Sequence, residues 1–296
     1  MTDLEAKTKE WLAKQGYPLE YAVANEFEAN GFRTQQGAFV ADASGELFRE
    51  IDVIASLDHQ ADDRPYRLSF VVECKWSRDK PWVVFTREVC HREEPPAYAV
   101  GSLLGEATMW ELLEDPVLYD LRFFERRQRT GFSGRQALTE KQDRSDLFYS
   151  TLQALSGTAV AYATVDDGER IFLNERISVH VVIPIVVVDG TLFEAFFSGS
   201  DVQIAKVSYS RVKWSGFQQR ETPIFIEIVS AEYLPNYARS LRNHSAALFD
   251  RLQRTGPRVI EAIGGPEWGH MHVRPKAHPE LLLPTYLRKA GYQHES

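Results

Sequence analysis

The chain has few of the residues that cross-link small secreted proteins or build zinc sites. Only 2 of its 296 residues are cysteines, Cys74 and Cys90, and neither belongs to a CxxC pair. A disulfide framework and a structural zinc site are therefore not expected. This sparse use of cysteine fits a reducing environment, and we expect a cytoplasmic protein.

Long hydrophobic runs are also missing. The longest one, Val181–Val188, contains Pro184 and is too short to cross a bilayer, and no basic and hydrophobic signal segment opens the chain. The sequence also lacks a Gly-rich phosphate loop and the elbow that carries the nucleophile of serine hydrolases. We expect a soluble protein with no membrane partner.

Composition places the chain among globular proteins. It is 44% hydrophobic and 26% charged, and its length allows one large domain or a domain with an appendage. The net charge of −8 argues against binding nucleic acid with the whole surface. A local basic patch remains compatible with that charge.

The first third of the chain reads as helix, strand, strand, strand. A short helix over 4–14 precedes a second one that starts near Pro18 and ends before Gly31. Glu20 lies near the middle of the apolar face of this second helix, which is an unusual place for an acid. The strands are predicted at 38–41 and 48–55, joined by a turn at Ser44-Gly45, and at 67–76.

Acidic and basic residues gather on two of these strands. Asp52 shares a strand face with Glu50, opposite Ile51, Val53 and Ala55, and on the next strand Glu73 and Lys75 share a face because alternate side chains point the same way. The other face of that strand is apolar and is expected to point into a core: Phe70, Val72, Cys74 and Trp76.

This arrangement resembles the PD-(D/E)xK, or restriction-endonuclease-like, nuclease superfamily. The family places an acid on the first helix, an Asp at a strand end and (Asp/Glu)-x-Lys on the following strand, and Glu20, Asp52, Glu73 and Lys75 match these positions. The resemblance covers roughly residues 17–77, with a weaker echo in the helix near 146–155 and the strands after it. Ile51 replaces the Pro of the family name.

The resemblance implies a site for Mg²⁺, for which Mn²⁺ can substitute. Asp52, Glu73 and the backbone carbonyl of Cys74 would bind the cation, which takes oxygen ligands and promotes attack of water on a phosphodiester. Lys75 would orient or activate the water and stabilise developing negative charge. Glu20 would support the same water or a second metal ion.

Each feature also has a purely structural explanation. Glu-x-Lys is common on solvated sheet faces, Asp52 could simply end a strand, and Glu20 falls in the first helical turn, where the helix dipole favours an acid. Glu50 is better explained as a rim residue and Gln153 as a solvated helix position. Three tail histidines are better explained as incidental than as ligands of a transition metal: His270, His272 and His278.

Two regions could contact nucleic-acid phosphates. One is the basic stretch 122–144, where Phe123, Phe124 and Phe132 could stack on bases, or could be core residues among solvated arginines. The second is the C-terminal helix and tail, for which a solvated face is the better explanation. No DNA-recognition module is visible. The arginines concerned are Arg122, Arg126, Arg127, Arg129 and Arg135 in the first region, and Arg239, Arg242, Arg251, Arg254 and Arg258 in the second.

Further elements are expected along the rest of the chain. After an irregular stretch with a short strand at 82–85 and a helix at 102–113, the sequence predicts a helix at 146–155. Residues 177–188 and 191–197, with Asp189-Gly190 between them, read as a second hairpin. A strand at 224–229, a helix from 232 to about 252, and a Pro-, Gly- and His-rich tail from Gly256 complete the chain.

We therefore expect an α/β fold of restriction-endonuclease type, with a mixed sheet flanked by helices. The nuclease core spans 1–230, with an insertion at about 81–145, and a C-terminal helix and tail at 231–296 pack on the same domain. The expected activity is Mg²⁺-dependent endonucleolytic hydrolysis of nucleic acid in restriction, defence or repair. DNA is the expected substrate, and a second copy of the chain or a partner subunit is a candidate partner. The alternatives are a non-catalytic nucleic-acid-binding subunit on the same scaffold and an ordinary interaction protein with a coincidental motif.

Overall fold

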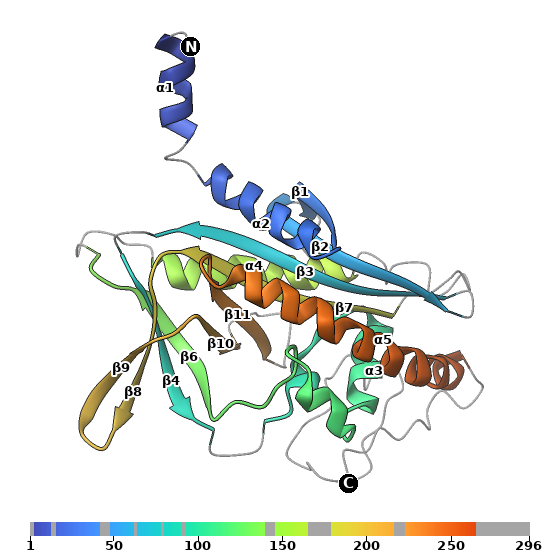
Figure 1. Ribbon diagram of the computed structural model, residues 1–296. Helices are drawn as coiled ribbons and strands as arrows, with labels where there is room; N and C mark the ends of the chain where they lie inside the picture. Colours follow the sequence, from blue (N-terminus) through green and yellow to red (C-terminus); the bar gives the residue numbers. More distant parts are fainter. Residues whose placement is uncertain are drawn as a thin grey trace.

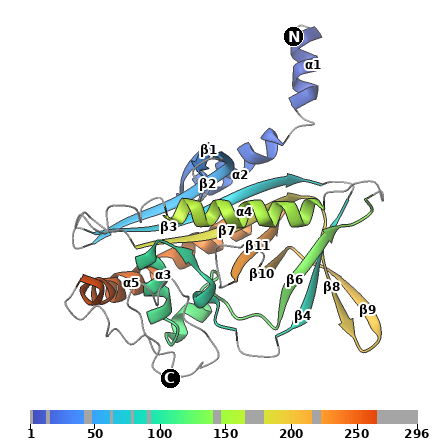
Figure 2. The same cartoon turned by 180° about the vertical axis from the view of Figure 1, so that it is seen from behind.

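The computed structural model describes residues 3–12, 16–41, 48–61, 64–77, 80–89, 93–139, 146–164, 179–215 and 223–264. Within these ranges the strands form one 11-stranded mixed sheet with helices on both sides (Figures 1 and 2). The predicted α/β class, a mixed sheet flanked by helices, is confirmed. None of the helices in the described ranges is both long and apolar enough to cross a bilayer.

The element bounds are as follows. The helices are α1 (Asp3–Leu12), α2 (Tyr17–Ala29), α3 (Leu103–Glu111), α4 (Leu147–Thr164) and α5 (Leu234–Gly264), with 3₁₀ turns η1 (Pro95–Tyr98) and η2 (Pro116–Asp120). The strands are β1 (Arg33–Ala41), β2 (Phe48–Ala61), β3 (Arg64–Trp76), β4 (Trp82–Glu88), β5 (Val100–Gly101), β6 (Arg129–Gln136), β7 (Val179–Asp189), β8 (Leu192–Ser198), β9 (Asp201–Lys206), β10 (Tyr209–Trp214) and β11 (Ile224–Ser230).

The sheet runs in the order β1-β2-β3-β7-β11-β10-β6-β4-β8-β9, with β5 paired to β7. β1, β2 and β3 are antiparallel neighbours, whereas β3, β7 and β11 are parallel. The carboxyl ends of these three parallel strands therefore lie at one edge. Residues in the predicted insertion contribute β4, β5 and β6 to this sheet, and the sequence interpretation missed β5, β6, β9 and β10.

Two apolar cores lie on opposite faces of the sheet. α2, α3 and α5 cover one face, where Phe70 and Val72 are fully buried, and α4 covers the other face, where Val71 and Phe148 belong to the same buried core (Figures 1 and 2). Phe27 of α2 stacks on Phe70 with 5.9 Å between ring centroids. Burial of one such ring stabilises the fold by about 1.5–3 kcal/mol, so this contact fixes α2 against β3.

The hairpin predicted around Asp189-Gly190 is wrong. β7 pairs with β3, β5 and β11, while β8 pairs in parallel with β4 and antiparallel with β9. A primed hairpin turn needs positive φ, and Gly190 is not among the positive-φ residues. Instead the chain between β7 and β8 runs beside the chain between β3 and β4, where Ser77 N donates to Asp189 O at 3.0 Å and Trp82 N to Thr191 O at 2.9 Å.

Two other expectations need correction. Trp76 was expected in a core, but it is 45% exposed because β3 extends beyond the helices that cover its face. The tail was expected to begin at Gly256, whereas α5 continues through Gly256 and Pro257 to Gly264. The predicted turn at Ser44-Gly45 and the tail histidines lie outside the described residues.

Gly190 should be required for close packing rather than for an unusual backbone conformation. A Cβ atom at this position would lie 2.6 Å from the carbonyl oxygen of Ser77, in the segment that runs beside Asp189 and Gly190. We expect Gly190→Ala to lower the free energy of unfolding by about 1–3 kcal/mol, measured by chemical denaturation. Gly199→Asn is the control, because Gly199 has φ of 67° with nothing within 4 Å, and Asn tolerates this conformation. Equal stability of Gly190→Ala and wild type would contradict the close approach of Gly190 to Ser77.

Candidate active site

The candidate site lies at the carboxyl end of β3, where the motif residues of β2 and β3 meet. The backbone N–H of Cys74 donates to Oδ2 of Asp52 at 2.7 Å. The N–H and C=O of one strand residue face the same neighbouring strand. The carbonyl oxygen of Cys74 therefore faces the side of β3 on which Asp52 lies.

Asp52 is positioned by an irregularity in the β1–β2 pairing. Gln36 pairs with Val53 and Ala38 with Ile51, so Gly37, with φ of 60°, stands opposite Asp52. Ile51 packs in the core under α4, whereas Val53 packs in the core under α2 and α5. The prediction that Ile51 and Val53 share a face is therefore wrong, since strand alternation breaks at Asp52.

Glu73 and Lys75 form an ion pair on the face of β3 that also carries Val71. Lys75 Nζ donates to Oε1 of Glu73, and their side chains are 22% and 20% exposed, respectively. Both residues lie on the parallel ladder with β7, where Glu73 pairs with Val186 and Lys75 with Val188. A carboxylate and an ammonium group are thus held side by side in a partly desolvated place.

Glu20 reaches this group from the first turn of α2. Its side chain is half-buried, and burial followed by the negative charges of Asp52, Glu50 and Glu73 raises its pKa, while Lys75 lowers it. A helix dipole acting alone would lower the pKa of an acid in this position. Burial first, and then the other acids of the site, therefore set the direction of the pKa shift of Glu20.

Burial also raises the pKa of both strand acids. For Asp52 the opposing effects are the Cys74 N–H bond and Lys75. For Glu73, Lys75 lowers the pKa whereas Asp52 and Glu50 raise it. Several carboxylates thus face one ammonium group in a poorly solvated site, an arrangement that attracts an additional cation.

The thiol of Cys74 does not take part in this group. It is buried in the core below α2, and burial followed by the charges of Asp52 and Glu20 raises its pKa well above the ordinary value. A thiol ligand must be deprotonated, so at neutral pH only the carbonyl oxygen of Cys74 is suited to metal binding. This side-chain placement agrees with the sequence prediction.

The donor set fits a hard divalent cation that keeps part of its water shell. Mg²⁺ is typically held by one or two carboxylates, with waters and substrate oxygens filling the remaining positions. Asp52, Glu73 and the Cys74 carbonyl supply such a set. No group of three or more His, Cys, Asp or Glu side chains suited to a metal ion occurs in the described ranges, so Glu20 is not part of a three-side-chain cage.

The weaker candidates remain outside this group or at its margin. Glu50 is exposed at the rim, as expected, although its charge raises the pKa of Glu20 and Glu73. Gln153 is exposed on α4, as the structural explanation predicted. His270, His272 and His278 cannot be placed, because they lie outside the described residues.

Ser77 is a supporting residue that the sequence interpretation missed. It is buried, its Oγ donates to Lys80 O, and Gln136 Nε2 donates to that Oγ at 2.6 Å. Together with the bond from Ser77 N to Asp189 O, these contacts fix the end of the motif strand. The two-residue period from Glu73 and Lys75 to Ser77 could have identified it.

The basic stretch does not present a row of arginines for phosphate binding. Arg122 is buried, contacts Glu125 at 2.8 Å and Glu227 at 3.3 Å, and lies over the ring of Tyr209. The alternative in which the arginines of this stretch form a solvated face is therefore wrong for Arg122. Other arginines of the stretch are also paired with acids: Arg126 with Glu94, Arg127 with Glu194 and Arg135 with Asp146.

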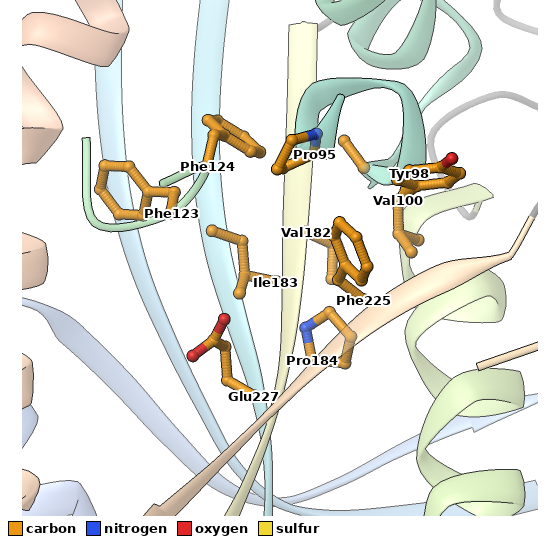
Figure 3. A pocket seen from close by; sticks show the side chains of 11 residues that line it. Pro95, Tyr98, Val100, Phe123, Phe124, Val182, Ile183, Pro184, Phe225 and Glu227 are labelled. Atoms are coloured by element: carbon orange, nitrogen blue, oxygen red, sulfur yellow. The ribbon is translucent and has the colours of Figure 1, made fainter. Parts of the chain in front are cut away.

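Phe123 and Phe124 are core residues, as the structural alternative proposed. Both are buried and line a small apolar cavity with Ile183 and Pro184, above the carboxylate of Glu227 (Figure 3). The cavity has a volume of only about 20 Å³, enough for about one water molecule. Phe132 differs from them, because it is 52% exposed.

Comparisons of the chain with known protein families, with curated protein sequences and with solved structures found no match.

The charge on Asp52 should reduce stability at neutral pH. Because the folded pKa is raised, the stability that Asp52 contributes is present below the ordinary pKa of 3.8 and is lost as the pH rises through the folded value. Asp52→Asn removes the charge and keeps an oxygen that can accept the Cys74 N–H. With EDTA present, we expect its melting temperature to exceed that of wild type by about 2–4 °C near pH 7.5, and the two to converge below about pH 4.

Asp58→Asn is the matched control on the same strand. Asp58 pairs with Arg33 at 2.9 Å and with Arg67 at 2.6 Å, so removal of its charge should leave the melting temperature unchanged or lower it near pH 7.5. A wild-type protein as stable as Asp52→Asn at that pH would show that the Asp52 charge carries no cost.

Proposed function

We propose that the protein is a Mg²⁺-dependent nuclease that hydrolyses phosphodiester bonds of nucleic acid, with DNA as the expected substrate. The observation that carries the proposal is the convergence of Asp52, Glu73 and Lys75 at one end of β3, joined by the Asp52–Cys74 hydrogen bond and the Glu73–Lys75 ion pair. Glu20 adds a third carboxylate whose pKa responds to the same group.

The order of the elements supports a restriction-endonuclease-like fold. α2 is followed by β1, β2 and β3, and later by α4 and β7, which pairs in parallel with the motif strand β3. This order agrees with the part of the chain that resembles the superfamily and with its echo near 146–155. Mn²⁺ is expected to substitute for Mg²⁺, because both accept oxygen ligands.

In this proposal Asp52, Glu73 and the Cys74 carbonyl hold the cation, which supplies Lewis-acid stabilisation of the phosphate when it is bound. Lys75 orients the attacking water and places positive charge where negative charge develops on the phosphate. The ion pair with Glu73 restricts the ammonium group to this task. Glu20 accepts a hydrogen bond from the same water on the α2 side of the site.

The central test is cleavage of supercoiled, linear and single-stranded DNA and of RNA, with Mg²⁺ or Mn²⁺ and with EDTA as the metal-free control. We expect wild type to cut at least one substrate, and Lys75→Ala and Asp52→Asn to lose at least about 100-fold in rate while remaining folded. Lys206→Ala, an exposed lysine on β9, is the matched control and should retain full activity. Activity that survives both site variants would reject this site.

Glu20 should contribute less than Lys75 because it lies outside the set of metal ligands. We expect Glu20→Gln to lower the cleavage rate by about tenfold, corresponding to about 1.4 kcal/mol of transition-state stabilisation. The measurement is the single-turnover rate at saturating Mg²⁺. An unchanged rate would leave only the helix-dipole role for Glu20.

The biological setting is proposed to be restriction, defence or repair, with a second copy or a partner subunit where both strands are cut. The same assay separates the nuclease from the non-catalytic binding subunit. Binding of DNA in EDTA, with no cleavage of any substrate in Mg²⁺ or Mn²⁺, would favour the binding subunit.

A further inference from the structure

A second recess lies between the end of β6, the end of β10 and the start of α4. It has a volume of about 480 Å³, within the usual range for small-molecule sites. None of the candidate catalytic residues lines it. The residues that do are Ser133, Gly134, Arg135, Asp146, Phe148, Tyr149, Ser150 and Trp214.

Aromatic rings form the walls of this recess. Tyr149 is 50% exposed and meets Trp214 edge to face, with ring centroids 5.2 Å apart. Phe148 lies beneath, in direct contact with Gly134, where an added Cβ would come within 2.4 Å of the ring. A side chain on β6 at this position would therefore displace the ring that forms the base of the recess.

Polar groups accompany the rings. Trp214 is 8% exposed, and no residue in the described ranges accepts a hydrogen bond from its buried Nε1. Leaving a buried donor without an acceptor costs about 1–3 kcal/mol. At the rim, Arg135 Nε lies 3.5 Å from Oδ2 of Asp146, and the other carboxylate oxygen, Oδ1, accepts the N–H of Phe148.

This combination selects the chemistry of the ligand. Aromatic walls favour a flat ring, and the Arg135–Asp146 pair at the rim, in which the Arg135 side chain is 75% exposed, offers both donors and an acceptor to the edge of such a ring. A nucleobase carries acceptors and donors on one flat ring, and Arg and Asp are side chains that read base edges. The carboxylate of Asp146 at the start of α4 disfavours a phosphate there, so the base is the recognised part.

We propose that the recess lined by Tyr149, Trp214, Arg135 and Asp146 is a binding site for an unpaired nucleobase. The proposal goes beyond phosphodiester hydrolysis, although a nucleic-acid substrate would supply such a base. Gln136 directly follows Arg135 and donates to Ser77, two residues after Lys75. A hydrogen bond thus links the strand that borders the recess to the end of the motif strand.

The test measures binding without cleavage. The Asp52→Asn protein in EDTA is titrated by calorimetry with each of the four nucleoside monophosphates, with single-stranded and duplex oligonucleotides, and with indole as a neutral aromatic probe. We expect at least one mononucleotide and the single strand to bind, the duplex to bind at least tenfold more weakly, and Tyr149→Ala to weaken base binding by about 5- to 150-fold.

Two further variants isolate the recess. Trp214→Phe replaces the indole that meets Tyr149 edge to face with a smaller ring, so it should weaken mononucleotide binding several-fold without loss of folding. Phe197→Ala removes an aromatic side chain that is 76% exposed on β8, outside the recess, and should change nothing. An adventitious surface effect would respond equally to Phe197→Ala and Tyr149→Ala, and would overturn the proposal.

The remaining outcomes separate this inference from the nuclease. Binding of indole but of no nucleotide, or nucleotide affinity unchanged in Tyr149→Ala, would overturn the base site even if wild type cleaves DNA. Base binding that depends on Tyr149 and Trp214 would support it even if wild type cleaves nothing. Selective binding of one base would additionally identify which base the recess reads.

Discussion

The parallel ladder between β3 and β7 is the contact on which the rest of the molecule depends. It runs from Tyr66 opposite Val179 to Trp76 opposite Asp189, and side chains of both strands enter both apolar cores. Parallel neighbours cannot be joined by a tight turn, so the connection must carry whole elements across the sheet, and α4 covers one face in consequence. The last pairs of the ladder hold Glu73 and Lys75, which ties the chemistry of the site to the best-buried part of the fold.

Local patterns predicted the elements and residues of the site better than they predicted its surroundings. Periodicity placed Glu20 on a helix and Asp52, Glu73 and Lys75 on strands, since these features depend on neighbours in sequence. The partner of each later strand depends on segments far away in the sequence. The Asp189-Gly190 pair suggested a hairpin, but β7 and β8 pair with β3 and β4 instead of with each other. Trp76 was assigned to a core because alternation says which face a residue takes but not where the covering helices end.

The acids of the site work against the stability of the fold that holds them. Burial raises the pKa of Glu20, Asp52 and Glu73, and neighbouring acids raise it further at Glu20 and Glu73. Lys75 is the cation that opposes this rise at all three. Besides the Cys74 N–H and Lys75, the contacts that keep them in place lie outside the charged group, in the Phe27–Phe70 stack and the hydrogen bonds of Ser77. A site of this kind tolerates its own charge because neutral packing around it is strong.

Gly37 gives β1 an influence on the site that its side chains do not have. Among the described residues, β1 contributes no ionisable group to the cluster, yet its positive-φ glycine opposite Asp52 accompanies the break that turns Ile51 to one core and Val53 to the other. A one-residue slip in this pairing would exchange the two faces of β2. The direction in which the acid points is therefore encoded on a neighbouring strand, in a residue without a side chain, where a search for reactive groups would not look.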